Sequence, residues 1–139
     1  MKRVFLDTNI LLDYGLDREL ADYAGSILEL GRRGLIELTA SYLSFANMGY
    51  ILRHHPIDEI YQLIRMMRQP VEVLPCNAAQ LDAGLITGVK DFEDVMQYQC
   101  AKEAGCDVII TNNKKDFQTF CDIPFLTSEE FLVQFDFDN

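Results

Sequence analysis

Short apolar runs alternate along this chain with longer segments of helical periodicity, and this alternation restricts the fold more than any other feature. Clusters of β-branched and other apolar residues predict strands at residues 4–6, 36–39, 71–74 and 108–110, with a short fifth strand at 123–126. Helical spacing and boundary residues predict helices from near Asn9, at 17–33, 41–55, 57–69, 77–88 and 91–105, and from a capping Ser128 onward. Strands separated by helices form βαβ units, so we expect an α/β fold with three layers (α/β/α) and a central, mostly parallel sheet.

The length and composition fit one domain, which we expect to span residues 1–139. A chain of 15.9 kDa buries roughly 68% of its unfolded surface, which is enough for one core. The apolar run near the start covers only residues 4–6, much shorter than the about 7–15 residues of a secretory signal. No apolar run approaches the ~18 residues of a membrane helix. We therefore expect a cytoplasmic protein with no membrane partner.

The cysteine pattern and the net charge narrow the function classes. The four cysteines form no C-x-x-C pair and the two histidines are adjacent, so we expect reduced, mostly buried thiols and no zinc site. A net charge of −10 argues against the broad phosphate-binding surface of a DNA-binding domain. It is compatible with a nuclease whose acids bind divalent cations, and it also suits a basic partner protein. Solubility alone accounts for it equally well.

Oxygen-bearing side chains follow several of the predicted strands. In open α/β sheets, ligands bind beyond the carboxyl ends of the strands, where these side chains would lie. Four separate segments bring such residues toward one sheet edge: Asp7 after the first strand, Asn47 on the helix after the second, Asp91 and Asp94 at the start of the helix at 91–105, and Asn113 and Asp116 after the fourth strand.

This set of donors suits a hard divalent cation such as Mg²⁺ or Mn²⁺, because both ions prefer oxygen ligands. We predict Asp7 and Asp94 as direct metal ligands, assisted directly or through water by Asp91 or Asp116. The ion would activate water and bind a phosphoryl oxygen. Each residue also has a structural alternative, since Asp91 with Asp94 is typical of a helix cap and Asp7 of a turn or cap. The convergence of four segments favours the metal site.

Three segments together resemble the PIN-domain family. Residues 4–13 (VFLDTNILLD) resemble its opening, where a strand ends in an acid followed by Thr or Ser and Asn. Residues 91–98 (DFEDVMQY) resemble its third motif, and residues 108–117 (VIITNNKKDF) its fourth. The order and spacing of these segments cover nearly the whole chain.

The resemblance implies a three-layer fold, dependence on Mg²⁺ or Mn²⁺, and endoribonuclease activity on single-stranded RNA. Small stand-alone members are similar to VapC-type toxins, so the resemblance also implies an antitoxin protein as a partner. By motif, Asp7 matches the first acid and Asp94 the third, while Asn113 falls where the fourth is usually Asp. Asn47 falls where the second acid is normally Glu, so the implied catalytic set of Asp7, Asn47, Asp94 and Asn113 lacks one negative charge.

Three functions compete at this point. The first is a metal-dependent endoribonuclease, such as the toxin of a toxin–antitoxin pair. The second, favoured by Asn47, is a catalytically weakened or inactive PIN domain that binds RNA or protein. The third is a receiver-like phosphoacceptor domain, which the sequence disfavours because Asp7 stands alone and Pro75-Cys76-Asn77 follows the third strand.

Apolar residues on the early helices also suggest a docking surface. Five of them could form a groove for a partner helix: Tyr14, Leu16, Leu20, Met66 and Met67. Core packing explains most of these residues equally well. We expect a homodimer, or a complex with an antitoxin-like protein, that uses this groove.

Overall fold

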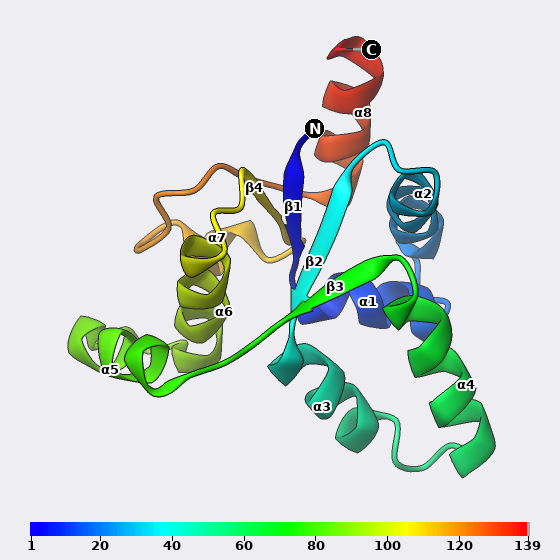
Figure 1. Ribbon diagram of the computed structural model, residues 1–139, viewed down its shortest axis with the longest axis horizontal. Helices are drawn as coiled ribbons and strands as arrows, with labels where there is room; N and C mark the ends of the chain where they lie inside the picture. Colours follow the sequence, from blue (N-terminus) through cyan, green and yellow to red (C-terminus); the bar gives the residue numbers. More distant parts are fainter. Residues whose placement is uncertain (139) are drawn as a thin grey trace.

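The computed structural model describes residues 1–138 and contains five strands and eight helices (Figure 1). The strands are β1 (Arg3–Leu6), β2 (Glu37–Ser41), β3 (Val71–Leu74), β4 (Val108–Ile110) and β5 (Phe125–Leu126). The helices are α1 (Thr8–Gly15), α2 (Ala21–Arg32), α3 (Tyr42–Ile51), α4 (Ile57–Arg68), α5 (Ala78–Thr87), α6 (Phe92–Glu103), α7 (Lys114–Phe117) and α8 (Ser128–Asp138).

All five strands lie in one parallel sheet with the order β3-β2-β1-β4-β5, which confirms the predicted α/β architecture. Val4 of the central strand β1 pairs with Leu38 of β2 and with Val108 of β4. The chain thus adds β2 and β3 on one side of β1, and then adds β4 and β5 on the other side. A receiver-like sheet has the order 2-1-3-4-5, so the observed order excludes that alternative.

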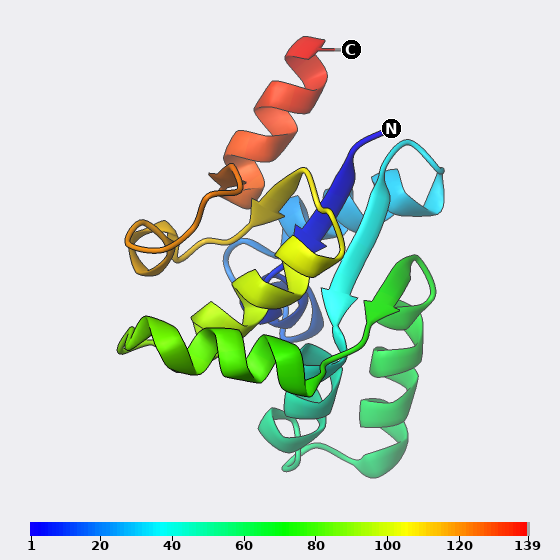
Figure 2. The same ribbon diagram turned by 60° about the vertical axis from the view of Figure 1, so that its left-hand side comes forward.

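The two central strands carry continuous apolar runs, at residues 4–6 of β1 and 108–110 of β4, because helices cover both faces of the sheet there. On one face, Val4 and Leu6 pack in a core with residues of α1, α2 and α8. On the other face, Phe5 and Ile109 pack against Tyr98 of α6 and the residues around α7. Figures 1 and 2 show α5 and α6 on one side of the sheet and α1, α2 and α4 on the other.

Two of the expected helices have different ends. The helix predicted for 17–33 begins only at Ala21, because Asp17 adopts a left-handed backbone conformation with φ of 50°. The turn there is held by Arg18, whose N–H donates to the carbonyl of Asp13 at 3.0 Å. The helix predicted for 41–55 ends at Ile51, five residues before Pro56.

The predicted caps are correct at two of the helix starts. The Ser41 hydroxyl accepts from the N–H of Leu43 at 3.0 Å, and the Asn77 side chain accepts from Gln80 at 2.9 Å. The cap of the last helix is Thr127 and not Ser128: the Thr127 hydroxyl accepts from the N–H of Glu130, and the Glu130 carboxylate accepts from the N–H of Thr127. This reciprocal pair is a capping box.

The four cysteines are all free thiols in the structure. Cys100 and Cys106 are buried and Cys121 is half-buried, as expected, but Cys76 is exposed on the loop after β3. Within residues 1–138, no helix combines the length and apolarity needed to cross a membrane.

The packing of α2 on β2 predicts the effect of a methyl group at Gly31. A Cβ at this position would lie 2.7 Å from Cγ of Leu38, a core residue of β2. We therefore expect Gly31→Ala to lower the free energy of unfolding by about 1–3 kcal/mol through overpacking, although alanine is the better helix former. Urea unfolding followed by circular dichroism measures this.

Gly49, inside α3, is the matched control because a Cβ there meets nothing within 4 Å. Gly49→Ala should raise the free energy of unfolding by about 0.5–1 kcal/mol, since only helix propensity changes. If both substitutions stabilise the protein equally, the contact of α2 with Leu38 is looser than described.

Candidate metal centre

Asp7 lies at the end of β1, where the order of the sheet reverses between β1 and β4. Its backbone N–H donates to the carbonyl of Ile110 at 3.0 Å, which extends the β1–β4 pairing by one residue. One carboxylate oxygen accepts from the N–H of Thr8 at 2.8 Å and the other from the hydroxyl of Thr111 at 3.0 Å. The carboxylate is therefore held from two sides, by the first residue of α1 and by the residue that follows β4.

The burial of Asp7 strongly perturbs its acidity. Only 3% of the residue is exposed, and this burial raises the pKa of Asp7 to about 6. The hydrogen bonds from Thr111 and Thr8 oppose the shift, whereas the negative charges of Glu93 and Asp116 add to it. A structural cap alone would not require an acid in this environment, because asparagine caps a helix as well.

Three further aspartates form a carboxylate cluster that interacts electrostatically with Asp7. Oxygen atoms of Asp91, Asp94 and Asp116 all lie within 4.8 Å of one another, although Asp116 comes from α7 and the other two from the start of α6. The side chain of Asp91 makes no capping hydrogen bond to α6, so the capping alternative does not account for it. Burial, followed by the charges of Asp7, Asp116, Asp91 and Glu93, raises the pKa of Asp94 to about 7.

The two predicted asparagines have different surroundings. Asn47 on α3 is half-buried, and its amide donates to the carboxylate of Glu93 on α6 at 3.3 Å. Asn113 is exposed at the start of α7, and within residues 1–138 its hydrogen bonds involve only its backbone. Asp116, one turn later, is the residue from this segment that joins the carboxylate cluster.

A buried polar network connects the three elements that carry these residues. The hydroxyls of Thr8 on α1 and Ser44 on α3 are hydrogen-bonded at 2.6 Å. The amide of Gln97 on α6 donates to both, at 2.8 and 2.7 Å. All three side chains are buried, so the network fixes the first turn of α1 relative to α3 and α6.

Glu93 and this network are the parts that the sequence interpretation missed. Glu93 stands next to Asp94 in the predicted motif, but its contact with Asn47 joins residues 46 positions apart, which no local pattern reveals. Gln97 follows Asp94 by three residues and therefore lies on the same helix face. That spacing was the available signal for Gln97.

The acids fit a divalent cation on two grounds. First, carboxylate oxygens from three residues converge within the span that one hard cation can bridge. Second, within residues 1–138 no lysine, arginine or histidine forms an ion pair with any of the clustered acids: Asp7, Asp91, Glu93, Asp94 and Asp116. Like charges held together without a protein counter-charge are stabilised by a bound cation.

Comparison with known sequences places the chain in a family. The sequence model of the PIN domain matches residues 3–115, which include the first strand, the start of α6 and the strand β4. The chain belongs to the PIN-domain family. The resemblance in the three sequence segments is thereby confirmed.

Individual relatives agree with this PIN-domain assignment. The chain is 27% identical to "Ribonuclease VapC1" of Aquifex aeolicus (strain VF5), over 94% of this chain and 93% of that protein. Its fold is similar to a chain of VapBC2 from Rickettsia felis bound to a promoter DNA fragment, with a TM-score of 0.70 and 16% identity over 90% of this chain and 98% of that one. It is also similar to a chain of a toxin–antitoxin complex from Klebsiella pneumoniae, with a TM-score of 0.66 and 18% identity over 90% and 97%.

The raised pKa of Asp7 predicts how the stability of this PIN domain depends on pH. Because the folded pKa, about 6, exceeds the ordinary value of 3.8, the stabilising effect of protonation is complete below pH 3.8 and is lost as the pH rises through 6. The shift corresponds to about 3 kcal/mol. Asp7→Asn should therefore raise the free energy of unfolding at pH 8 by up to about that amount, and by little at pH 4.

Urea unfolding at pH 4, 6 and 8 in the presence of a chelator measures this dependence. Asn retains an oxygen that can accept from Thr8 and an amide that can donate to Thr111, so the hydrogen-bonding capacity is kept. The control is Asp22→Asn, which changes an exposed acid on α2. A constant difference between Asp7→Asn and the native protein at all three pH values would contradict the assigned cause.

Proposed function

We propose that this PIN domain is a metal-dependent endoribonuclease that hydrolyses phosphodiester bonds of single-stranded RNA, as the toxin of a toxin–antitoxin pair. The observation that carries the proposal is the carboxylate cluster at the sheet edge between β1 and β4, without protein counter-charges among residues 1–138. The similarity to a protein named as a ribonuclease, over nearly the full length of both chains, supports the same activity.

Asp7 and Asp94 are the direct ligands that we propose for Mg²⁺ or Mn²⁺, with Asp91 and Asp116 completing the acidic set. When bound, a divalent cation lowers the pKa of water and stabilises negative charge on phosphoryl oxygens. The protein contributes rigidity: Thr8 and Thr111 hold Asp7 so that it does not reorganise during the reaction.

The net charge of −10 bears directly on RNA binding at this site. RNA phosphates and the clustered carboxylates repel one another, so the site in its metal-free form disfavours the substrate. A cation between them reverses the sign of the interaction. RNA and metal should consequently bind cooperatively, each raising the affinity for the other.

The activity prediction is that cleavage of a single-stranded RNA requires Mg²⁺ or Mn²⁺ and stops on chelation. Asp7→Asn and Asp94→Asn should each lower the rate at least about 100-fold, because each removes a charge that binds the ion. Both variants should remain folded, since each substitution relieves repulsion among the acids. Cleavage of a fluorescently labelled RNA oligonucleotide and thermal melting measure the two effects.

Asp22→Asn on α2 is the matched control and should retain full activity. Cleavage that persists in Asp94→Asn, together with a loss of folding stability, would make Asp94 a structural residue. RNA binding without cleavage at any metal concentration would instead favour the second candidate, a catalytically inactive PIN domain. The neutral side chain of Asn47 is the feature that keeps this candidate open.

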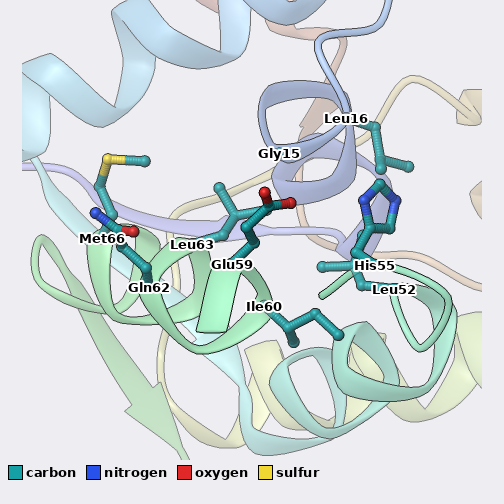
Figure 3. Close-up of a pocket in the computed structure, with 9 residues that line it drawn as sticks. All are labelled: Gly15, Leu16, Leu52, His55, Glu59, Ile60, Gln62, Leu63 and Met66. Atoms are coloured by element: carbon teal, nitrogen blue, oxygen red, sulfur yellow. The ribbon is translucent and has the colours of Figure 1, made fainter. Parts of the chain in front are cut away.

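The partner that we propose is an antitoxin-like protein with an apolar, basic segment. A cavity of about 270 Å³ lies between the end of α1, the end of α3 and the helix α4, lined by apolar residues that include Leu16, Leu63 and Met66 (Figure 3). Asp17, Asp22 and Glu29 line the hollow next to it. This surface therefore suits a segment that combines apolar and basic side chains.

The predicted groove residues divide between this surface and the interior. Leu16 and Met66 line the cavity, and Tyr14 lines the neighbouring hollow. Met67 is fully buried and belongs to the core, so its assignment to the groove was wrong. Leu20 is half-buried at the start of α2 and lines neither hollow. The proposed groove is accordingly lined by fewer of the predicted residues than the sequence suggested.

The partner prediction uses Met66, which is 41% exposed and can carry a charge without unfolding the core. Met66→Lys should weaken binding to the protein encoded beside this chain's gene at least about tenfold, as measured by calorimetry, because the added cation repels a basic segment and is costly to bury without a partner. Val133→Lys on α8, which is also exposed, is the control. Light scattering tests the expected homodimer. A monomer that binds no neighbouring gene product would contradict the partner proposal.

A further inference from the structure

Glu93 is an acid beside the proposed ligands that is hydrogen-bonded to α3. It lies in the first turn of α6, directly before Asp94, and its side chain is exposed. The amide of Asn47 donates to one of its carboxylate oxygens at 3.3 Å. The contact is a second link between α3 and α6, in addition to the buried hydrogen bond from Gln97 to Ser44.

The charge of Glu93 affects both of the proposed direct metal ligands. It raises the pKa of Asp7, at the end of β1, and also the pKa of Asp94, on its own helix. Repulsion between like charges accounts for both effects.

Asn47 explains why this acid is held in place. Its side chain carries no charge and cannot serve as an anionic ligand, but its NH₂ group is a hydrogen-bond donor. A donor at this position binds an acceptor carboxylate, whereas an acid at the same position would repel it. The family resemblance leads to the expectation of a glutamate on α3 here. The negative charge missing from α3 is thus present on α6, within hydrogen-bond reach of the same position.

We propose that Glu93 supplies the carboxylate that Asn47 lacks, as a further ligand for the divalent cation, and that Asn47 is a positioning residue that orients it. The inference rests on the metal site of the proposed function and adds a residue to it. The site then carries as many negative groups as the family pattern implies, with one of them on α6 instead of α3.

The test is calorimetric titration of Mn²⁺ into the RNA-free protein. Glu93→Gln keeps the length of the side chain and an oxygen that can accept from Asn47, so it removes only the charge. We expect Mn²⁺ to bind about 10–100-fold more weakly, the range found when a group supporting a metal site is lost. Melting of Glu93→Gln should show no loss of stability, because repulsion by its acidic neighbours is relieved.

Glu103→Gln is the matched control. Glu103 lies at the other end of the same helix and also accepts from an amide, that of Asn77, at 3.0 Å. The main causes of the raised pKa values of Asp7 and Asp94 do not include Glu103. Mn²⁺ affinity should be unchanged in Glu103→Gln. This control separates the loss of a specific charge from a general change in the charge of α6.

A charge exchange tests the relation between the two positions. The double variant Asn47→Glu/Glu93→Gln moves the carboxylate from α6 to α3 while keeping the total charge, and it should bind Mn²⁺ as tightly as the native protein. Asn47→Ala should weaken binding in the native background and have no effect in Glu93→Gln. Additive effects of these two single substitutions would mean that Asn47 does not act through Glu93.

Asp94→Asn distinguishes the failure of this inference from that of the proposed function. If Asp94→Asn loses Mn²⁺ binding while Glu93→Gln retains the native affinity, Glu93 is not a ligand and the metal site stands without it. If neither substitution changes Mn²⁺ binding, the proposed metal site itself is wrong. If both weaken it and the exchange variant restores it, the assignment of Glu93 holds.

Discussion

The burial of one carboxylate, that of Asp7, is the constraint on which the arrangement of the site depends. Asp7 ends the central strand and is bonded through its backbone to β4 and through its side chain to Thr8 and Thr111. Burying an ionised group is unfavourable, and the pKa of about 6 records that cost. The fold therefore holds an unfavourable charge at its centre, which a bound cation would offset. On the proposed function, stability without metal is exchanged for the capacity to bind one.

Parallel pairing explains how residues so distant in sequence converge. Because every strand in the sheet points the same way, the segments after β1, β2 and β4 all begin at one edge. The helix α6 runs back across the sheet to β4, so its first turn, with Asp91, Glu93 and Asp94, lies at that same edge. The strand order reverses between β1 and β4, which is the position where ligands bind in open α/β sheets.

The sequence predicts this framework well and the contacts across it poorly. Apolar runs such as residues 4–6 identify buried strands, and caps such as Ser41 and Asn77 are local and were predicted correctly. Helix starts that depend on an unusual backbone angle, as at Asp17, were missed because nothing in the pattern excludes a regular helix there. Pairs such as Asn47 with Glu93 depend on how α3 meets α6, and one sequence without relatives cannot supply that geometry.

The role proposed for Glu93 illustrates why residue-by-residue transfer from a motif is an incomplete guide to an acidic metal site. A divalent cation responds to the sum of the negative charge around it as well as to the identity of each ligand, and a carboxylate on a long side chain can reach the same place from a neighbouring helix. Replacing an acid with asparagine on α3 therefore does not by itself lower the charge of the site. It converts a repulsive neighbour of Glu93 into a hydrogen-bond donor, so the neutral residue can favour the acid beside it.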